Sequence, residues 1–316
     1  MKTLLKIALC FLVGSALAQS YPSKPIRVSV AFPPGGPVDI IARLIGPKLT
    51  EILGQQVVVE NRVGASGNVA TSDVAKATPD GYTLLTHSSA YAVNPSLFKN
   101  AGYDPNKDLL PIAIVAQQAN IILVNASFPA STLDELRKAV TKGKLAFASP
   151  GNGTTPHLTA QNLFVVRWKA DVTHIPFKGA GPGVAALLAG EPPIGCFAGS
   201  GPMSNIKAGK FRALAVSSAK RLPQLPEVPT LNELGYGGME DYTWVGIFAP
   251  AGTPREIAQK LNDAVLKAVH SPDIRERLDG LAFEATAAPL KETADYVRAE
   301  VEKWGRVVRE TKATVD

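Results

Sequence analysis

Short apolar runs alternate with stretches of helical periodicity along nearly the whole chain. The run 26–31 predicts a buried strand, and apolar positions spaced three and four residues apart from Ile40 predict a helix that ends near Leu53. Pro47 lies inside this helix, so we expect a kink or a broken turn there. Further strands are expected at 57–61, 82–86, 145–148, 172–176, 191–197, 211–217 and 244–249. Strands and helices in alternation predict an α/β fold with largely parallel sheets.

A turn rich in proline and glycine, Phe32–Asp39, separates the first strand from the first helix. Glycine has no Cβ to keep a ligand from the backbone, and a helix start presents unpaired N–H groups and partial positive charge. We therefore expect this loop to bind an anion. Asp39 could orient this loop, but its residue type favours another role, the N-cap of the helix. The candidate ligand-binding residues here are Pro34, Gly35, Gly36, Pro37, Val38 and Asp39.

Three more loops rich in glycine or small hydroxyls follow predicted strands. In open α/β sheets such loops meet at the edge where ligands bind. His157 could touch a ligand or lie buried against the loop backbone, and Lys178 is expected to be a solvated lysine at the rim. The candidates from these loops are Ser88, Ser89, Ala90, Ser149, Gly151, Asn152, Gly153, Thr154, Thr155, His157, Gly179, Ala180 and Gly181.

The apolar run 109–124 is long enough to leave one domain and enter another, and the strand at 244–249 is expected to return. The strand–loop–helix unit occurs twice on either side of residue 120. These features predict two similar lobes that enclose a ligand between them. The first lobe is expected to contain residues 19–118 and 243–316, and the second residues 119–242. Hinge motion is expected near 117–120 and 241–245.

Residues 1–18 have a positively charged start, an apolar centre and the small-residue sequence Ala16-Leu17-Ala18. This pattern predicts a secretory signal peptide and a periplasmic mature protein. Without Lys2 and Lys6 the formal net charge falls from +6 to +4, and the basic residues are scattered. A nucleic-acid partner is therefore not expected, because such proteins carry a basic stripe.

Cys196 is the one cysteine that follows the predicted signal peptide, so we expect a small buried thiol and no disulfide within the chain. The four histidines lack the spacing of zinc ligands, and we predict neither a metal nor a cofactor. The sequence around Ser200 lacks the spacing of a hydrolase nucleophile, so an enzyme is not expected.

Several motifs in fixed order carry a family resemblance from Tyr21 to the last helix. The chain resembles the Bug-type periplasmic receptors, which are the solute-binding components of tripartite tricarboxylate transporters. The motifs lie at 21–27, 32–36 with Asp39, 58–62 with 64–68, 79–84, 151–158, 176–179, 206–210 and 249–254.

This resemblance implies a two-lobed periplasmic binding protein of type II, the Venus-flytrap fold, with two crossing segments. It implies a small organic acid as ligand, held through backbone N–H groups, small hydroxyls and ordered water. Integral-membrane transporter subunits are the implied partners, and the receptor itself is expected to be a monomer.

The chain departs from the family pattern at two walls of the expected site. Similar proteins usually carry hydroxyl residues where this chain has Pro37 and Val38, so up to two donors are lost. Phe197, a further candidate contact, and Ala198 make a wall apolar that is polar in many relatives. We therefore expect a monocarboxylate or an aromatic acid in preference to a citrate-like or amino-acid ligand.

Two other functions use the same kind of sequence. A sensor that passes ligand occupancy to a membrane signalling partner would have the same fold, and a pull-down of membrane partners would distinguish it from a transport receptor. An exported hydrolase or isomerase is the enzymatic alternative, which binding without turnover would exclude.

Overall fold

The computed structural model describes residues 21–311, 313 and 315. The predicted signal peptide therefore lies outside the described residues. Within the described part, none of the helices combines the length and the apolar character that a membrane span requires.

Ten strands of the described residues form one hydrogen-bonded sheet in the order β2-β1-β3-β9-β4-β7-β5-β6, with β8 and β10 also paired to β4. The outer pairs are parallel, whereas every pair that involves β4 or β9 is antiparallel. The strands are β1 Ile26–Val30, β2 Val57–Asn61, β3 Thr83–Ser88, β4 Leu109–Asn125, β5 Leu145–Ser149, β6 Val172–Pro176, β7 Ile194–Ala198, β8 Phe211–Val216, β9 Tyr242–Pro250 and β10 Glu284–Ala285.

The helices follow the strands in the alternating order that the sequence predicts. They are α1 Pro37–Leu53, the 3-10 helix η1 Ala65–Gly67, α2 Asn68–Ala75, α3 Ala90–Leu97, α4 Leu133–Lys142, α5 Thr155–Gln161, the π-helix η2 Asn162–Arg167, α6 Ala180–Ala189, α7 Met203–Lys207, α8 Arg255–Val269, α9 Pro272–Gly280 and α10 Leu290–Thr311.

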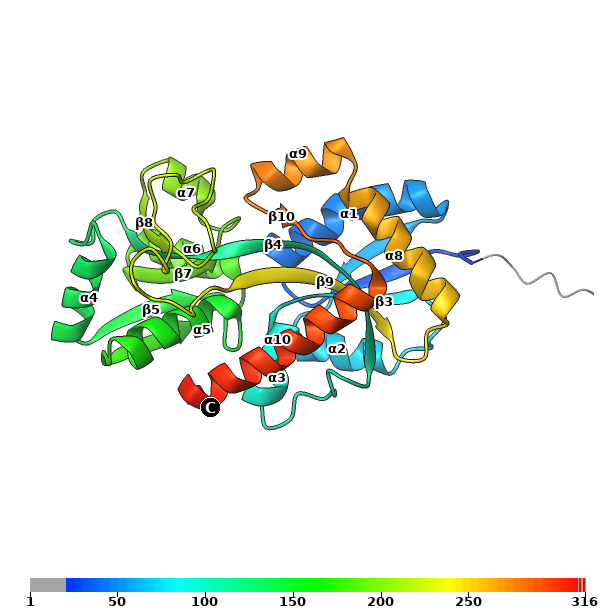
Figure 1. Ribbon diagram of the computed structural model, residues 1–316, viewed down its shortest axis with the longest axis horizontal. Coiled ribbons are helices and arrows are strands. Elements are labelled where there is room, and N and C mark those ends of the chain that lie inside the picture. The colour runs from blue at the N-terminus through cyan, green and yellow to red at the C-terminus, as the bar shows by residue number, and fades with distance from the viewer. Residues whose placement is uncertain (1–20, 312, 314, 316) are drawn as a thin grey trace, which may run out of the picture.

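Figure 1 shows an elongated molecule in which the elements gather in two groups joined by β4 and β9. One group contains α1, α2, α8 and α9 around β1 to β3, and the other contains α4 to α7 around β5, β7 and β8. β4 and β9 pair with each other from Leu109 opposite Pro250 to Ala119 opposite Tyr242. Beyond Ala119, β4 pairs with β7 and β8 instead, so this one strand belongs to both groups.

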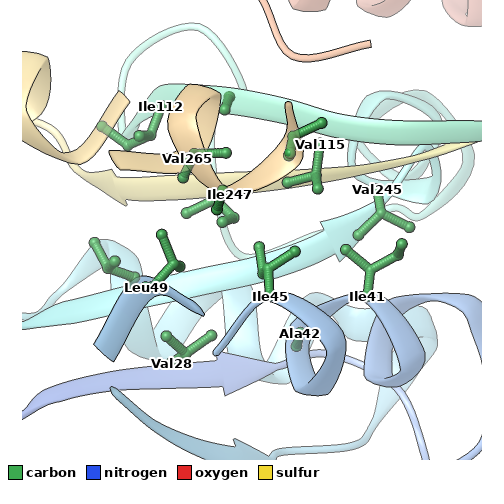
Figure 2. Packing of buried hydrophobic residues seen from close by; sticks show 14 of the residues in the cluster. Val28, Ile41, Ala42, Ile45, Leu49, Ile112, Val115, Val245, Ile247 and Val265 are labelled. Carbon is green, nitrogen blue, oxygen red and sulfur yellow. The ribbon is translucent and has the colours of Figure 1, made fainter. Parts of the chain in front are cut away.

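Packing of helices on the sheet creates a separate core on each side of the crossing strands. Figure 2 shows Ile41, Ile45 and Leu49 of α1 pointing toward residues of β4, β9 and α8, among them Val115, Ile247 and Val265. In the second group, α4 contributes its buried face to a cluster around β4, β5 and β7. Each group thus has the buried apolar surface that a folding unit needs.

The predicted elements agree with the structure except at a few places. α1 continues through Pro47, which lies on its exposed face, where water can solvate the carbonyl that proline leaves without a partner. The helical pattern predicts that α6 begins at 184, but it begins at Ala180. Neither the helix α3 nor the two-residue strand β10 was predicted. The expectation of largely parallel pairing holds only for the outer strands, because the two crossing strands run in opposite directions.

Buried Glu300 of α10 links this C-terminal helix to β9 by a hydrogen bond. Its Oε2 accepts hydrogen bonds from the indole N–H groups of Trp244 and Trp304, both at 2.9 Å. Lys303 Nζ lies 3.3 Å from the other carboxylate oxygen. All three partners saturate a carboxylate that is only 7% exposed, as a buried charge requires.

Replacement of Glu300 by Ala should lower the free energy of unfolding by about 3 kcal/mol, because two buried indole N–H groups lose their acceptor. Urea unfolding followed by tryptophan fluorescence measures the change. Glu302→Ala is the matched control, since Glu302 lies on the same helix and is exposed. Equal stability of the two variants would refute the anchoring role of Glu300.

Candidate functional site

A small cavity of about 50 Å³ lies where loops from the two groups of elements meet. On a scale where one water needs about 10–15 Å³, it has room for a few water-sized groups. Among the described residues that line it, none carries a charged side chain. The lining residues are Phe32, Pro33, Pro34, Gly36, Pro37, Val38, Ser88, Ser89, Pro150, Thr154, Thr155, Pro156, Gly179, Ala180, Gly181, Pro182, Ala198 and Thr243.

The first wall is the start of α1. Gly36 is the N-cap residue in extended backbone, Pro37 is the first helical residue, and no side chain caps the helix. Because the first N–H groups of a helix have no partner within it, the backbone N–H of Val38 is available to a ligand. Pro37 itself offers no N–H.

Asp39 holds this loop in place from behind, so the prediction that it is the N-cap is wrong. It is the third residue of α1, and its Oδ2 accepts a hydrogen bond from the Gly35 backbone N–H at 3.0 Å. Its Oδ1 accepts from Arg43 Nε and Asn61 Nδ2, both at 2.8 Å. Gly35 has a φ of +81°, a left-handed conformation that suits glycine. Asp39 therefore orients the loop and does not line the cavity.

The opposite wall is the start of α6. Gly179 is its N-cap with a φ of +110°, and again no side chain caps the helix. The Gly179 N–H donates to the Pro150 carbonyl at 2.8 Å, which ties this loop to the one after β5. A Cβ on Gly179 would lie 3.4 Å from Pro33, so glycine lets the two walls approach closely. The N–H groups of Ala180 and Gly181 open the helix and have no acceptor within it.

Hydroxyl groups form the floor between these walls. Ser89 Oγ lies 3.0 Å from Thr155 Oγ1, which lies 2.7 Å from Thr243 Oγ1. Thr243 in turn donates to Asn120 Oδ1 at 2.7 Å, and Asn120 Nδ2 donates to Asp241 Oδ1 at 2.6 Å. A buried chain of hydrogen bonds thus runs from the cavity to the two crossing strands.

Eleven of the predicted residues line the cavity, and nine do not. The lining residues are Pro34, Gly36, Pro37, Val38, Ser88, Ser89, Thr154, Thr155, Gly179, Ala180 and Gly181. The others are Gly35, Asp39, Ala90, Ser149, Gly151, Asn152, Gly153, His157 and Phe197. A direct ligand contact for either set remains a prediction.

Close packing explains why only part of the loop 149–157 lines the cavity. The carbonyl of Asn152 accepts a hydrogen bond from Ser66 Oγ at 2.6 Å. A Cβ on Gly153 would come within 2.6 Å of Asn94 Oδ1 on α3. The same argument holds for Phe197, whose ring lies against Gly183 of α6, with only 2.7 Å to an added Cβ there.

Thr243 is the lining residue that sequence reasoning overlooked most clearly. The expected return strand began at Trp244, although the expected hinge at 241–245 did include Thr243. Phe32, Pro33, Pro150 and Pro156 belong to loops that were identified, but their apolar side chains gave no sign of facing a ligand. Ala198 was expected in an apolar wall, and it lines the cavity with Pro182.

Two buried histidines, His87 and His157, and the half-buried His174 lie beside or beneath the loops. His157 and His174 stack with ring centroids 3.9 Å apart, and Ser149 Oγ lies 2.7 Å from His174 Nε2. Burial lowers the pKa of His157 to about 4, and burial together with the neighbouring His157 lowers the pKa of His174 to about 3. Burial likewise lowers the pKa of His87 to about 4. All three are therefore neutral at neutral pH.

Two further kinds of chemistry-bearing group are the Cys196 thiol and potential metal ligands. Burial raises the pKa of the Cys196 thiol, so the thiol stays protonated. No group of three or more His, Cys, Asp or Glu in the described part could hold a metal ion.

Stability should fall as pH is lowered from 6.5 toward 5. Each unfolded histidine takes up a proton near pH 6.5 while its folded form stays neutral, so acid favours the unfolded chain. Buried Asp241 acts in the opposite direction, because burial raises its pKa to about 6 and the folded state binds the extra proton. The three histidines outweigh the one carboxyl, so the free energy of unfolding should fall by about 3 kcal/mol between pH 6.5 and 5.

Urea unfolding at half-unit pH steps measures this dependence. Asp241→Asn should make it steeper, and His87→Gln should make it shallower. A stability that is constant over this range would contradict the neutral state of the histidines.

Comparison with known proteins gives the same family for the whole fold. The protein-family model described as tripartite tricarboxylate transporter family receptor matches residues 41–312 of this chain. The structure of periplasmic binding protein BugD is 34% identical, with a TM-score of 0.88 over 93% of this chain and 99% of that one. Rpa4515 of R. palustris with adipate is 31% identical, with a TM-score of 0.88 over 93% and 99% of the two chains.

MatC (Rpa3494) from Rhodopseudomonas palustris with bound malate is 34% identical, with a TM-score of 0.85 over 91% of this chain and 100% of that one. These similarities confirm the predicted periplasmic-binding-protein fold. The family consists of solute-binding receptors, in agreement with the expectation that the chain is not an enzyme. The chain belongs to the receptor family of the tripartite tricarboxylate transporters.

Proposed function

We propose that this receptor captures a small carboxylate in the cavity between the starts of α1 and α6. The observation that carries the proposal is the pair of helix starts, at Gly36 and Gly179, which face one cavity without a capping side chain. Unpaired N–H groups and the positive end of each helix dipole favour a negative charge at this place.

The available donors are sufficient for one carboxylate. Val38 supplies an N–H from the first wall, and Ala180 and Gly181 supply two from the opposite wall. Ser88 adds a hydroxyl whose oxygen accepts from the Ala90 N–H at 3.3 Å and whose hydrogen is uncommitted within the described residues. A carboxylate that accepts two or three such bonds stays ionised when buried.

Apart from the hydroxyl groups of the floor and of Thr154, the remaining lining is apolar, which supports a ligand with one carboxylate. Among the described lining residues, no arginine, lysine or histidine is present to neutralise a second negative charge. The relatives Rpa4515 and MatC have been solved with adipate and malate, which are dicarboxylates. For this receptor we propose a monocarboxylate or a small aromatic acid, because Val38, Pro34 and Ala198 offer apolar contact.

Ligand binding is proposed to close two lobes, residues 19–118 with 243–316 and residues 119–242. The crossing strands β4 and β9 would bend near 117–120 and 241–245. Contacts such as Ser66 Oγ with the Asn152 carbonyl already join the two sides. A ligand that binds both walls favours the closed state by its higher affinity for it.

The closed receptor is proposed to deliver its ligand to integral-membrane transporter subunits, as its family implies. Residues 1–18 would serve as the signal peptide that exports the chain to the periplasm, and the mature protein would act as a monomer. A sensor role would use the same closure, and a pull-down of membrane partners distinguishes the two.

A thermal-shift panel of small acids tests the ligand class. We expect monocarboxylates or small aromatic acids to raise the melting temperature, and their methyl esters to have no effect because they lack the charge. Stabilisation by citrate or aspartate alone would contradict the monocarboxylate proposal.

Gly36→Glu tests the position of the site. Gly36 has an extended backbone with φ of −85°, and its added Cβ would meet only the Pro33 carbonyl at 3.7 Å, so the variant should fold. Its carboxylate should occupy and repel the anion site, and affinity measured by calorimetry should fall more than 100-fold. Gly280→Glu is the matched control, because its Cβ would meet no atom within 4 Å and it lies on α9. Retained affinity in Gly36→Glu would place the anion elsewhere.

A further inference from the structure

The direction of the buried hydrogen-bond chain decides what the cavity floor can offer a ligand. Asp241 fixes one end: its Oδ1 can only accept, so the amide group of Asn120 must point its Nδ2 toward it at 2.6 Å. The carbonyl oxygen of the same amide then faces Thr243. Since Asn120 Oδ1 has no hydrogen, the hydrogen in its 2.7 Å contact comes from Thr243 Oγ1.

Each hydroxyl has a single hydrogen, so the direction propagates to the cavity. Thr243 has given its hydrogen to Asn120, and its 2.7 Å contact with Thr155 must be filled by the hydrogen of Thr155. Thr155 has then no hydrogen left, and Ser89 must donate in their 3.0 Å contact. The three hydroxyls of the floor therefore donate their hydrogens to other protein groups, and only their oxygen lone pairs remain for a ligand.

The other threonine of the lining is committed as well. Thr154 Oγ1 donates to the Gly151 carbonyl at 2.8 Å, and its oxygen caps α5 by accepting from the His157 N–H. Of the hydroxyls that line the cavity, Ser88 alone keeps a hydrogen without a partner within the described residues. Most of the small hydroxyls expected to donate to a carboxylate can therefore only accept.

The state of Asp241 does not reverse this direction. Thr159 Oγ1 lies 2.8 Å from Asp241 Oδ2 and also 2.8 Å from the Thr155 carbonyl. When Asp241 is protonated on Oδ2, its O–H can donate a hydrogen bond to Thr159 Oγ1. The hydroxyl of Thr159 then donates its own hydrogen to the Thr155 carbonyl. Oδ1 accepts from Asn120 in both states, so the floor remains an array of acceptors.

We propose that Ser89, Thr155 and Thr243 form an acceptor subsite for a hydroxyl group, so that the natural ligand is a hydroxy acid. This inference rests on the proposed function: the carboxylate lies at the helix starts, and the ligand hydroxyl donates to the floor. Lone pairs repel a carboxylate oxygen and attract a donor. A hydroxyl fits better than an ammonium group, because the described lining has no acidic side chain to balance a positive charge.

Calorimetric titration with three matched sets of acids tests the subsite. The sets are butyrate, 2-hydroxybutyrate and 2-aminobutyrate; phenylacetate, mandelate and phenylglycine; and succinate, malate and aspartate. On each scaffold that binds, the hydroxy acid should bind at least 10-fold more tightly than the acid without the hydroxyl, because a missing donor leaves buried acceptors unpaired.

Each outcome has a separate meaning. Failure of all nine acids to bind would overturn the proposed carboxylate function. Equal or tighter binding of the acids without the hydroxyl would overturn the subsite alone, as when a water molecule serves the acceptors. Tightest binding of the amino acids would overturn the assignment to a hydroxyl.

Two variants test the origin of the preference. Asp241→Asn can donate to Asn120 as well as accept, which permits the chain to reverse, so the preference for the hydroxy acid should fall toward equality. Asp279→Asn is the control, since Asp279 is exposed on α9. Ser89→Ala removes the last member of the chain without taking an acceptor from any other member, and it should reduce the preference at least 3-fold. An unchanged preference in folded Asp241→Asn or Ser89→Ala, checked by circular dichroism, would refute the inference.

Discussion

The unsatisfied backbone N–H groups at the starts of α1 and α6 are the constraint on which the site depends. Both helices begin at a glycine with no side chain to cap them, and both begin at the cavity. Buried N–H groups need acceptors. A ligand carboxylate that accepts from these N–H groups would complete the two helices, so the proposed site needs no charged residue in its lining. The same arrangement explains why Asp39 lies behind the loop, where it fixes the Gly35 backbone without competing for the ligand.

The sheet brings these two helix starts together. β4 pairs with β9 from Leu109 to Ala119 and then continues into the second group of elements, so the walls of the cavity are joined through one pair of strands. The polar chain from Ser89 to Asp241 ends on these strands. The cavity floor and the proposed hinge are thus parts of one hydrogen-bonded network.

Much of the fold could be predicted from the sequence, because its strands are short apolar runs bounded by glycine and proline. The strands at 57–61 and 172–176 have the predicted bounds. The antiparallel pairing of β4 with β9 could not be predicted, since partners in a sheet depend on contacts between distant segments. β10 is too short for its pattern to be recognised.

The loops that form the site could be predicted from the sequence, but which of their residues line the cavity could not. Gly36 and Gly179 could be predicted because a glycine that precedes a helix has no Cβ and lets a ligand approach the backbone. The orientation of Asp39 depends on Arg43 and Asn61, whose approach no local pattern records. Thr243 and the direction of the hydroxyl chain depend on Asp241 and Asn120, which are far apart in sequence and meet only in the fold.

The most direct measurement is the chemical identity of the molecule that the native protein carries. Purified without unfolding, the receptor can be examined by native mass spectrometry, and its bound molecule can then be released and identified. The account predicts a small carboxylic acid with one hydroxyl group near the carboxylate. A neutral or cationic molecule in the site would contradict it.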